Sequence, residues 1–448
     1  MQSPSISGNR LLQSAWFINL WAVTAAFGTY FCMYMYRKPF TAASYTSDDW
    51  GDWDQKAVLV ASQVIGYLIS KIIGIRIVSE VTRGQRALML LGLILFSHFS
   101  LLLFAVAPSP WHIVCLFLNG LPLGIVFGLV LGFLEGRRMT EALTAGLCAS
   151  FILAGGVSKT VGQNVLNFTQ ESWQWTVPQS ERWMPFLAGV LFLIPIACFI
   201  WMLSRTPPPD ALDETARSKR EPMSKQDRQH ILRAYAGGLA AISVMYLLVT
   251  ILRSLRDDFA PEILLGLGAT VKPSAYATID FWVALIVMFI NGSSVFIANN
   301  RVALQASLGV CAAGFLVTLA AVGLQMTSPI SPEGMMILVG AGLYLPYVAV
   351  HTTVFERLIA LTRDRANVGF LMYLADASGY FGYVVLMLVK NFLPKSSDAS
   401  GDILRWFLIS CVIASTISLF LIVGAMIRFA RLEKKERQEP MPTDPPHP

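Results

Sequence analysis

The sequence contains too few charged residues to cover the surface of a soluble protein of its length. Only 14% of its 448 residues are Asp, Glu, Lys or Arg, whereas soluble domains carry roughly 25%. Hydrophobic residues make up 55% of the chain, and the mean hydropathy is +0.57. Much of the molecular surface must therefore face lipid rather than water.

Patterns typical of several other protein classes are also missing. The six cysteines all lie within apolar stretches, which argues against a disulfide framework; they are Cys32, Cys115, Cys148, Cys198, Cys311 and Cys411. No Cys/His cluster has metal-ligand spacing and no P-loop is present, so we expect no metal and no other cofactor. The loops contain no nucleophile–base pair, which argues against a membrane-embedded enzyme.

Twelve apolar stretches are long enough to cross a membrane, because a spanning helix needs about 20 residues. They cover 14–43, 56–79, 86–107, 111–134, 140–166, 183–204, 231–258, 275–299, 302–325, 334–359, 366–391 and 403–429. The first stretch is not followed by a small-residue cleavage site, so it reads as a span and not as a signal peptide. We therefore expect an all-α membrane protein with 12 transmembrane helices.

The longest polar stretch divides the predicted spans into two sets of six. We expect an N-terminal half at 1–204, a cytoplasmic linker at 205–230, a C-terminal half at 231–430 and a disordered cytoplasmic tail at 431–448. Two six-helix halves around a long central loop resemble the layout of the major facilitator superfamily. In that superfamily the halves are pseudo-symmetric and the substrate site lies between them.

The distribution of basic loop residues predicts the orientation. One set of alternate loops is rich in Arg and Lys, as at Arg137 and Arg138, while the other set holds few bases and the acidic residues of 48–54. By the positive-inside rule, both termini are cytoplasmic. We expect a monomer in the lipid bilayer of a bacterial inner membrane, since no organellar targeting segment is apparent. The net charge of +6 is attributed to this topology and not to nucleic-acid binding.

Two arginines, one in the first span of each half, are the main candidates for a substrate site. Arg37 and Arg253 each follow a tyrosine by seven residues, about two helical turns. Ionisable groups inside a span are costly and usually line a cavity or contact a partner. Two opposed guanidiniums can hold a divalent oxyanion through bidentate hydrogen bonds. The alternative is that both arginines snorkel to the outer interface beside Asp48 and Asp257.

The two arginine segments resemble those of a known transporter family. The run at 34–40, Tyr-Met-Tyr-Arg-Lys-Pro-Phe, is similar to the first-helix signature of the organophosphate:phosphate antiporters, the glycerol-phosphate and hexose-phosphate carriers. The segment 251–261 resembles their seventh helix. The resemblance implies that Arg37 and Arg253 bind a phosphoryl group. That family's histidine in the fifth span falls near Phe151 here, so the resemblance does not carry over the substrate.

Other polar residues within or beside the spans complete the predicted site. The further candidates for substrate binding are Tyr34, Lys38, Lys71, Lys159, His351 and Tyr380, and those for coupling or gating are Glu80, Arg256, Asp257, Asp280 and Asp376. We expect Asp376 to pair with a basic residue of the cavity or to couple protons. His351 either titrates with transport or is a hydrogen-bonded core histidine.

The sequence therefore predicts a secondary active transporter for a small anionic, phosphorylated solute. The two halves would move by alternating access around a site with paired arginines. A carrier of a non-phosphate organic anion and a transporter-like membrane sensor are the alternatives that the sequence leaves open.

Overall fold

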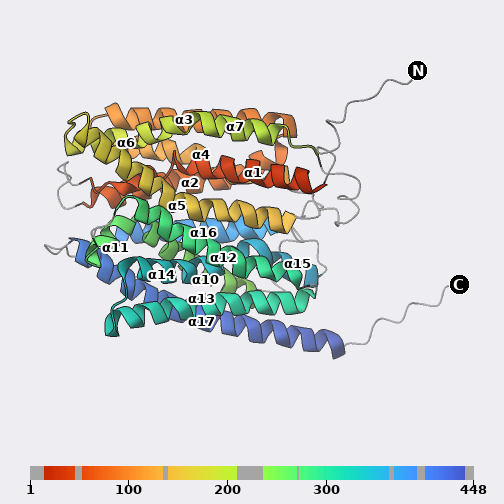
Figure 1. Cartoon of the computed structure of the whole chain (residues 1–448). Coiled ribbons are helices and arrows are strands. Elements are labelled where there is room, and N and C mark those ends of the chain that lie inside the picture. The colour runs from red at the N-terminus through yellow and green to blue at the C-terminus, as the bar shows by residue number, and fades with distance from the viewer. Residues whose placement is uncertain are drawn as a thin grey trace, which may run out of the picture.

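A computed structural model of the chain shows a bundle of long helices (Figure 1). The structure describes residues 15–45, 53–134, 140–208, 236–269, 272–297, 299–362, 368–390 and 399–438. Within these ranges the chain forms helices, turns and short connections, with no strand. The predicted all-α class is confirmed.

The elements fall into two groups that lie side by side, coloured red to yellow-green and green to blue in Figure 1. The first group is α1 (Ala15–Tyr34), η2 (Pro39–Ala42), α2 (Gln55–Glu80), α3 (Arg83–Val106), α4 (His112–Leu134), α5 (Thr140–Glu171), α6 (Val177–Leu191) and α7 (Leu193–Ser204). The second is α10 (Ala236–Asp258), α11 (Ala260–Gly266), α12 (Ser274–Ser293), η3 (Ser294–Phe296), α13 (Asn300–Thr327), α14 (Pro332–Ala349), η4 (Val350–Val354), α15 (Phe355–Thr362), α16 (Val368–Lys390) and α17 (Ala399–Gln438). Most of the predicted linker at 205–230 lies outside the described residues, so its boundaries stay predictions.

A multi-span membrane architecture is confirmed by the length and hydropathy of these helices. Ten helices of the described chain can cross a membrane, and the pair α6–α7, bent by 42°, adds an eleventh if it forms one span. The bend lies just before Pro195, whose missing N–H removes a helical hydrogen bond. α16, which matches the predicted span 366–391, packs against α2 and α10 but is not among these ten. The count of twelve spans stays a prediction.

We expected the first predicted span, 14–43, to be one continuous helix, but the helix is interrupted. α1 ends at Tyr34, the chain turns through 35–38, and η2 begins at Pro39. Pro39 has no N–H to donate to the carbonyl four residues earlier, that of Met35, and its ring clashes with that carbonyl in a continuous helix, which accounts for the break. Arg37 and Lys38 therefore lie on a turn beyond the end of α1.

Two side-chain amides hold this turn in place. Asn119 Nδ2 donates to the carbonyl of Tyr36 at 3.0 Å, and Gln63 Nε2 donates to the carbonyl of Arg37 at 2.9 Å. Gln63 also donates to Asn119 Oδ1 at 2.7 Å. Carbonyl groups freed at a helix end need such partners when they are buried. The turn that carries Arg37 is thus fixed to α2 and α4.

The last helix is longer than predicted. α17 runs to Gln438, whereas we expected a disordered tail from residue 431. The segment 431–438, Arg-Leu-Glu-Lys-Lys-Glu-Arg-Gln, consists of residues with high helix propensity, which explains the extension. Residues 439–448 lie outside the described part of the chain.

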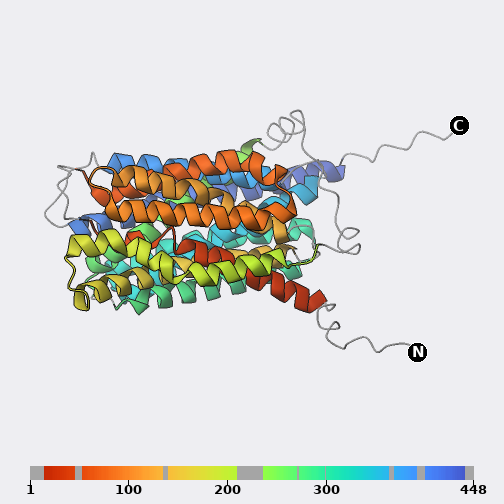
Figure 2. The same cartoon turned by 90° about the horizontal axis from the view of Figure 1, so that it is seen from above.

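Two helix pairs join the halves: α5 packs along α12, and α2 packs along α16. Figure 2 shows that α1 begins and α17 ends at the same end of the bundle. We call this the proximal end, and the opposite end, where α2 begins, the distal end. Gly156 allows the close approach of α5 to α12, because a Cβ atom there would overlap the carbonyl of Tyr276 and lie 2.9 Å from Asp280 Cβ.

We expect Gly156→Ala to lower the melting temperature of the purified protein. Overpacking of a close contact costs about 1–3 kcal/mol, and here the opposing atom belongs to the backbone. Gly309→Ala in α13 is the control, because nothing lies within 4 Å of a Cβ at that position. Equal melting temperatures for the two variants would contradict the close contact between the halves.

Candidate functional site

Arg37 and Arg253 reach the interior of the bundle from opposite halves. Arg37 lies on the turn after α1 and is 3% exposed, while Arg253 lies near the distal end of α10 and is 4% exposed. Both approach Tyr380 of α16. The Arg37 Cζ atom is 5.8 Å from the centre of the Tyr380 ring, and Arg253 Nη2 is 3.5 Å from its hydroxyl oxygen. The two arginines therefore converge on one side chain.

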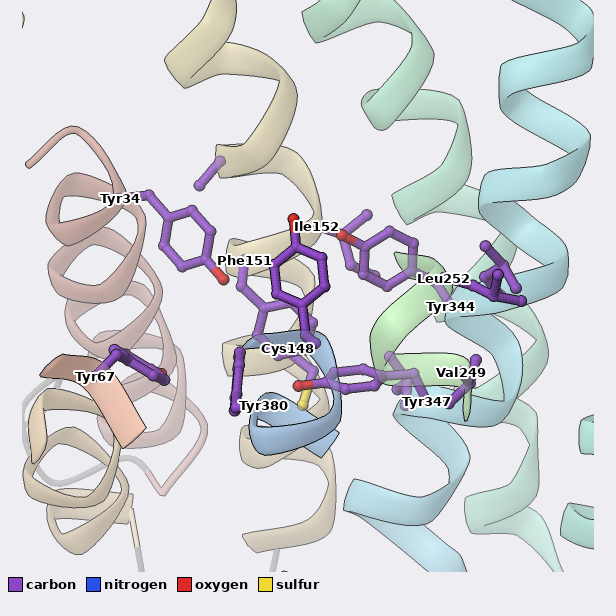
Figure 3. Close-up of a cluster of buried hydrophobic side chains, with 14 of the residues drawn as sticks. Tyr34, Tyr67, Cys148, Phe151, Ile152, Val249, Leu252, Tyr344, Tyr347 and Tyr380 are labelled. Atoms are coloured by element: carbon purple, nitrogen blue, oxygen red, sulfur yellow. The ribbon is translucent and has the colours of Figure 1, made fainter. Parts of the chain in front are cut away.

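Tyrosine rings lie against the two guanidinium groups, and Figure 3 shows how these tyrosines lie relative to one another. We define the tyrosine cluster as Tyr34, Tyr67, Tyr344, Tyr347 and Tyr380. Arg37 Cζ lies 3.9 Å from the ring centre of Tyr67, and Arg253 Cζ lies 4.4 Å from that of Tyr347. In Figure 3, Tyr34 and Tyr67 lie on one side and Tyr344 and Tyr347 on the other, with Tyr380 between them. Aromatic faces stabilise a guanidinium without neutralising its charge.

Neither arginine forms an ion pair with a carboxylate within the described residues. The Nε atom of each arginine also has no hydrogen-bond partner. By contrast, the other buried bases for which the structure gives an ion pair include Lys38, Lys56, Lys71, Lys159 and Arg256. Two guanidinium charges that lack a carboxylate partner make this site strongly electropositive. A buried charge without a partner is also costly, so the site favours a ligand of opposite charge.

Lys38 and Lys159, predicted as substrate ligands, are paired with acids of the other half. Lys38 Nζ lies 3.0 Å from Asp257 Oδ2 and also donates to Asp258. Lys159 Nζ lies 2.5 Å from Asp257 Oδ1. Asp257, a predicted gating residue, therefore receives two lysines of the first half at the distal end of α10. This arrangement joins the halves between the arginines and the distal end.

Two further ion pairs join the halves at the distal end itself. Lys56 Nζ of α2 lies 2.5 Å from Glu262 Oε1 of α11, and Lys390 Nζ of α16 lies 2.5 Å from Asp54 Oδ2. Burial raises the pKa of the Asp54 carboxyl, but Lys390 outweighs burial and holds that pKa below its usual range. Together with the contacts of Asp257, these pairs form what we call the distal gate.

The remaining gating candidates are placed differently. Arg256 Nη2 lies 3.1 Å from Asp280 Oδ1, so this pair joins α10 to α12 within the second half. Arg256 also donates to the carbonyl of Met336 at 3.0 Å. The side chain of Glu80 lies outside the described residues.

Lys71 and Asp376 form the other cross-half ion pair, between α2 and α16. Pairing was one of the two roles expected for Asp376. Tyr246 of α10 donates its hydroxyl hydrogen to the same carboxylate, and His351 Nε2 lies 3.6 Å from Asp376 Oδ1. His351 is thus buried in a hydrogen-bonded cluster, close to Tyr347 of the tyrosine cluster.

Some residues of the site were not predicted from the sequence. Tyr67, Tyr344 and Tyr347 contact the arginines, and Gln63 and Asn119 hold the turn that carries Arg37. Each lies in an apolar span whose pattern is also typical of ordinary packing. A polar amide in the middle of a span, as at Gln63 and Asn119, is the one signal that the sequence offered.

Comparison with known proteins identifies the fold class. The structure resembles a bacterial homologue of the human lysosomal transporter Spinster in an inward-facing, unoccupied conformation, at 12% identity and a TM-score of 0.64, covering 92% of this chain and 98% of that one. It also resembles a D-xylose–proton symporter (14%, TM-score 0.61, 92% and 97% covered) and the nucleoside transporter NupG (10%, TM-score 0.59, 92% and 100% covered). The chain therefore has the fold of major-facilitator-type transporters.

The family is shown by sequence. The chain belongs to the DUF5690 family, described as a family of unknown function, whose model matches residues 39–432. No curated protein matches the sequence. None of these matches is to an organophosphate antiporter, so the fold assignment does not depend on the resemblance to that family.

We expect Asp257→Asn to open the distal gate. The substitution leaves Lys159 without its carboxylate, and removing one partner of a buried pair costs about 3–5 kcal/mol. Spin labels at Trp111→Cys and Leu265→Cys, two exposed distal positions in opposite halves, would report the separation in a background without the native cysteines. The distance between the labels should increase.

Asp280→Asn is the matched control, since it breaks an equally buried ion pair within one half. This variant should melt at a lower temperature without lengthening the distal distance. An unchanged distance in Asp257→Asn, or the same increase in both variants, would show that the cross-half pairs do not hold the gate closed.

Proposed function

We propose that this protein is a secondary transporter that carries a small divalent oxyanion, of the phosphate or phosphate-ester class, across the membrane. The solute binds between Arg37 and Arg253. The observation that carries the proposal is the pairing pattern of the buried charges. The buried lysines of the first half have carboxylate partners in the second, whereas the two convergent arginines have aromatic rings instead.

The geometry favours an anion over a neutral solute. Two guanidiniums beside one tyrosine hydroxyl offer hydrogen-bond donors from opposite sides, and a tetrahedral dianion can accept from both at once. The bound anion supplies the counter-charge that the cluster otherwise lacks. Aromatic rings around the donors exclude water and strengthen these hydrogen bonds.

Alternating access follows from the position of the distal gate. The ion pairs of Asp257, Glu262 and Asp54 hold the halves together at the distal end, and the pair Lys71–Asp376 holds them together on the proximal side of the arginines. With both termini cytoplasmic, as the loop charges predict, the proximal end faces the cytoplasm. Rocking of the halves would break the distal pairs to open one path to the site and the Lys71–Asp376 pair to open the other.

The test is thermal stabilisation of the purified protein by a panel of phosphate, glycerol phosphate, hexose phosphate, sulfate and carboxylates. A ligand that binds only the folded state stabilises it by about 2.7 kcal/mol at a hundred times its Kd. We expect a phosphate compound to raise the melting temperature. Arg37→Ala and Arg253→Ala should each weaken binding by about thirtyfold or more, since truncating one member of a buried charged contact costs about 2–5 kcal/mol.

Arg37→Lys and Arg253→Lys keep the charge but lose the planar fork, so they should bind the anion with intermediate affinity. Arg205→Ala removes an exposed arginine at the end of α7 and serves as the control. The absence of stabilisation by every anion, or stabilisation that persists in both alanine variants, would refute the anion site.

A further inference from the structure

A second cluster of polar side chains lies nearer the proximal end than the arginines. It consists of Lys71, Tyr246, His351 and Asp376, and we call it the histidine cluster. Tyr246 precedes Arg253 by seven residues on α10, which places the cluster about 10 Å along the helix from the anion site. His351 lies in η4, a π-helical turn within the span that begins as α14. Such turns are frequent at functional sites because they reorient side chains.

When the His351 ring is neutral, the histidine cluster has too few hydrogens to give the Nε2 atom of His351 a donor. His351 Nδ1 is 3.0 Å from the carbonyl oxygen of Tyr347, and a carbonyl can only accept, so Nδ1 carries a hydrogen. In a neutral ring, Nε2 then presents a lone pair. Tyr246 has one hydroxyl hydrogen and donates it to Asp376 Oδ1.

Two oxygen atoms nevertheless lie near His351 Nε2. Asp376 Oδ1 is 3.6 Å away, and the hydroxyl oxygen of Tyr246 is 3.3 Å from Nε2 and 3.4 Å from Nδ1. With the Tyr246 hydrogen already given to Asp376, neither oxygen can donate to Nε2. A proton added to Nε2 replaces the repulsion between its lone pair and the Asp376 carboxylate with attraction. The side chain of His351 is only 4% exposed, so bulk water does not replace that proton.

The surroundings of the cluster come from both halves. The titratable groups that face Asp376, His351 or the Lys71 ammonium are Lys71 and Tyr67 of α2, Cys148 of α5, Tyr246 of α10, Tyr347 of α14 and Tyr380 of α16. Phe127 of α4 contributes a ring edge-on to the imidazole. Among these groups, imidazole is the one whose charge ordinarily changes between pH 5 and 8.

We propose that His351 Nε2 is a proton-binding site, shared with Tyr246 and Asp376, and that its proton is carried together with the anion. The coupling rests on the proposed function, whereas the proton site itself does not. When movement of the halves opens the cluster to water on one side of the membrane, a proton from that water adds to the Nε2 lone pair. It returns to water on the other side when the ring is deprotonated there. Net transport is then anion–proton symport.

The two sites share the side chains that would couple them. Lys71 Nζ lies 5.2 Å from the ring centre of Tyr67 and 5.1 Å from that of Tyr380, and both rings also contact Arg37. When His351 is protonated, both its ring and the Lys71 ammonium interact with the single negative charge of Asp376. The net charge beside the arginines therefore rises by one unit, which strengthens anion binding by about tenfold at this separation. By reciprocity, the bound anion favours the protonated ring.

The proton site can be tested without any solute. Infrared difference spectra of the protein in lipid nanodiscs, between pH 8 and pH 5, report protonation of imidazole rings. We expect a band that disappears in His351→Gln and shifts in Asp376→Asn. It should persist in His98→Gln, which removes a buried histidine stacked on Phe186 at 4.6 Å. If no band depends on His351, the proton site is overturned.

The coupling is tested in proteoliposomes with the anion that stabilises the protein most in the panel above. In the wild type, an inward proton gradient should drive uptake above equilibrium, and His351→Gln should exchange the anion without responding to the gradient. Uptake that ignores the gradient in the wild type would overturn the coupling. Failure of every anion to bind would overturn the proposed function and the coupling with it, while the infrared result would still decide the proton site.

Discussion

The cost of burying charge between membrane-spanning helices governs the arrangement of this interior. A charged side chain away from water is costly unless a partner of opposite charge or a bound ligand compensates for the lost hydration. Lys38, Lys71 and Lys159 satisfy this constraint by reaching across the boundary between the halves. The same ion pairs therefore solve a desolvation problem and fasten the halves together, so their rearrangement is inseparable from any relative movement of the halves.

The chemical difference between lysine and arginine explains which bases take which place. An ammonium group is a compact point charge that pairs closely with carboxylate oxygens, and the buried lysines lie in such ion pairs. A guanidinium is planar and weakly hydrated, and it stacks on aromatic rings. Arg37 and Arg253 lie against Tyr67 and Tyr347 in this way. Tyrosine rings can shield a guanidinium from lipid while leaving its donors available.

The sequence predicted the fold well because a membrane leaves few alternatives to long apolar helices. The positions of Arg37 and Arg253 in the two halves also indicated that they would meet, and they share a contact with Tyr380. The sequence did not reveal that Lys159 would pair with Asp257, because 98 residues separate them and several other acids were equally available as partners. The break after α1 was missed because the hydropathy of 14–43 continues through Pro39, although that proline was the signal for it. Tyr67, Tyr344 and Tyr347 were not predicted, because a ring that stacks on a guanidinium and a ring that packs against lipid-facing helices look alike in one sequence.

The amide pair Gln63–Asn119 has a consequence for which solutes can fit. It ties the carbonyls of Tyr36 and Arg37 to α2 and α4 and not to the rest of α1. Arg37 is therefore mounted on the rigid frame of its half, as Arg253 is mounted on the continuous helix α10. The distance between the two guanidinium groups is then set by how far the halves tilt relative to each other. Bending of α1 changes it little. In the proposed transporter, a solute would be selected by the width of its anionic group, whereas the bulk of its remaining part would matter less.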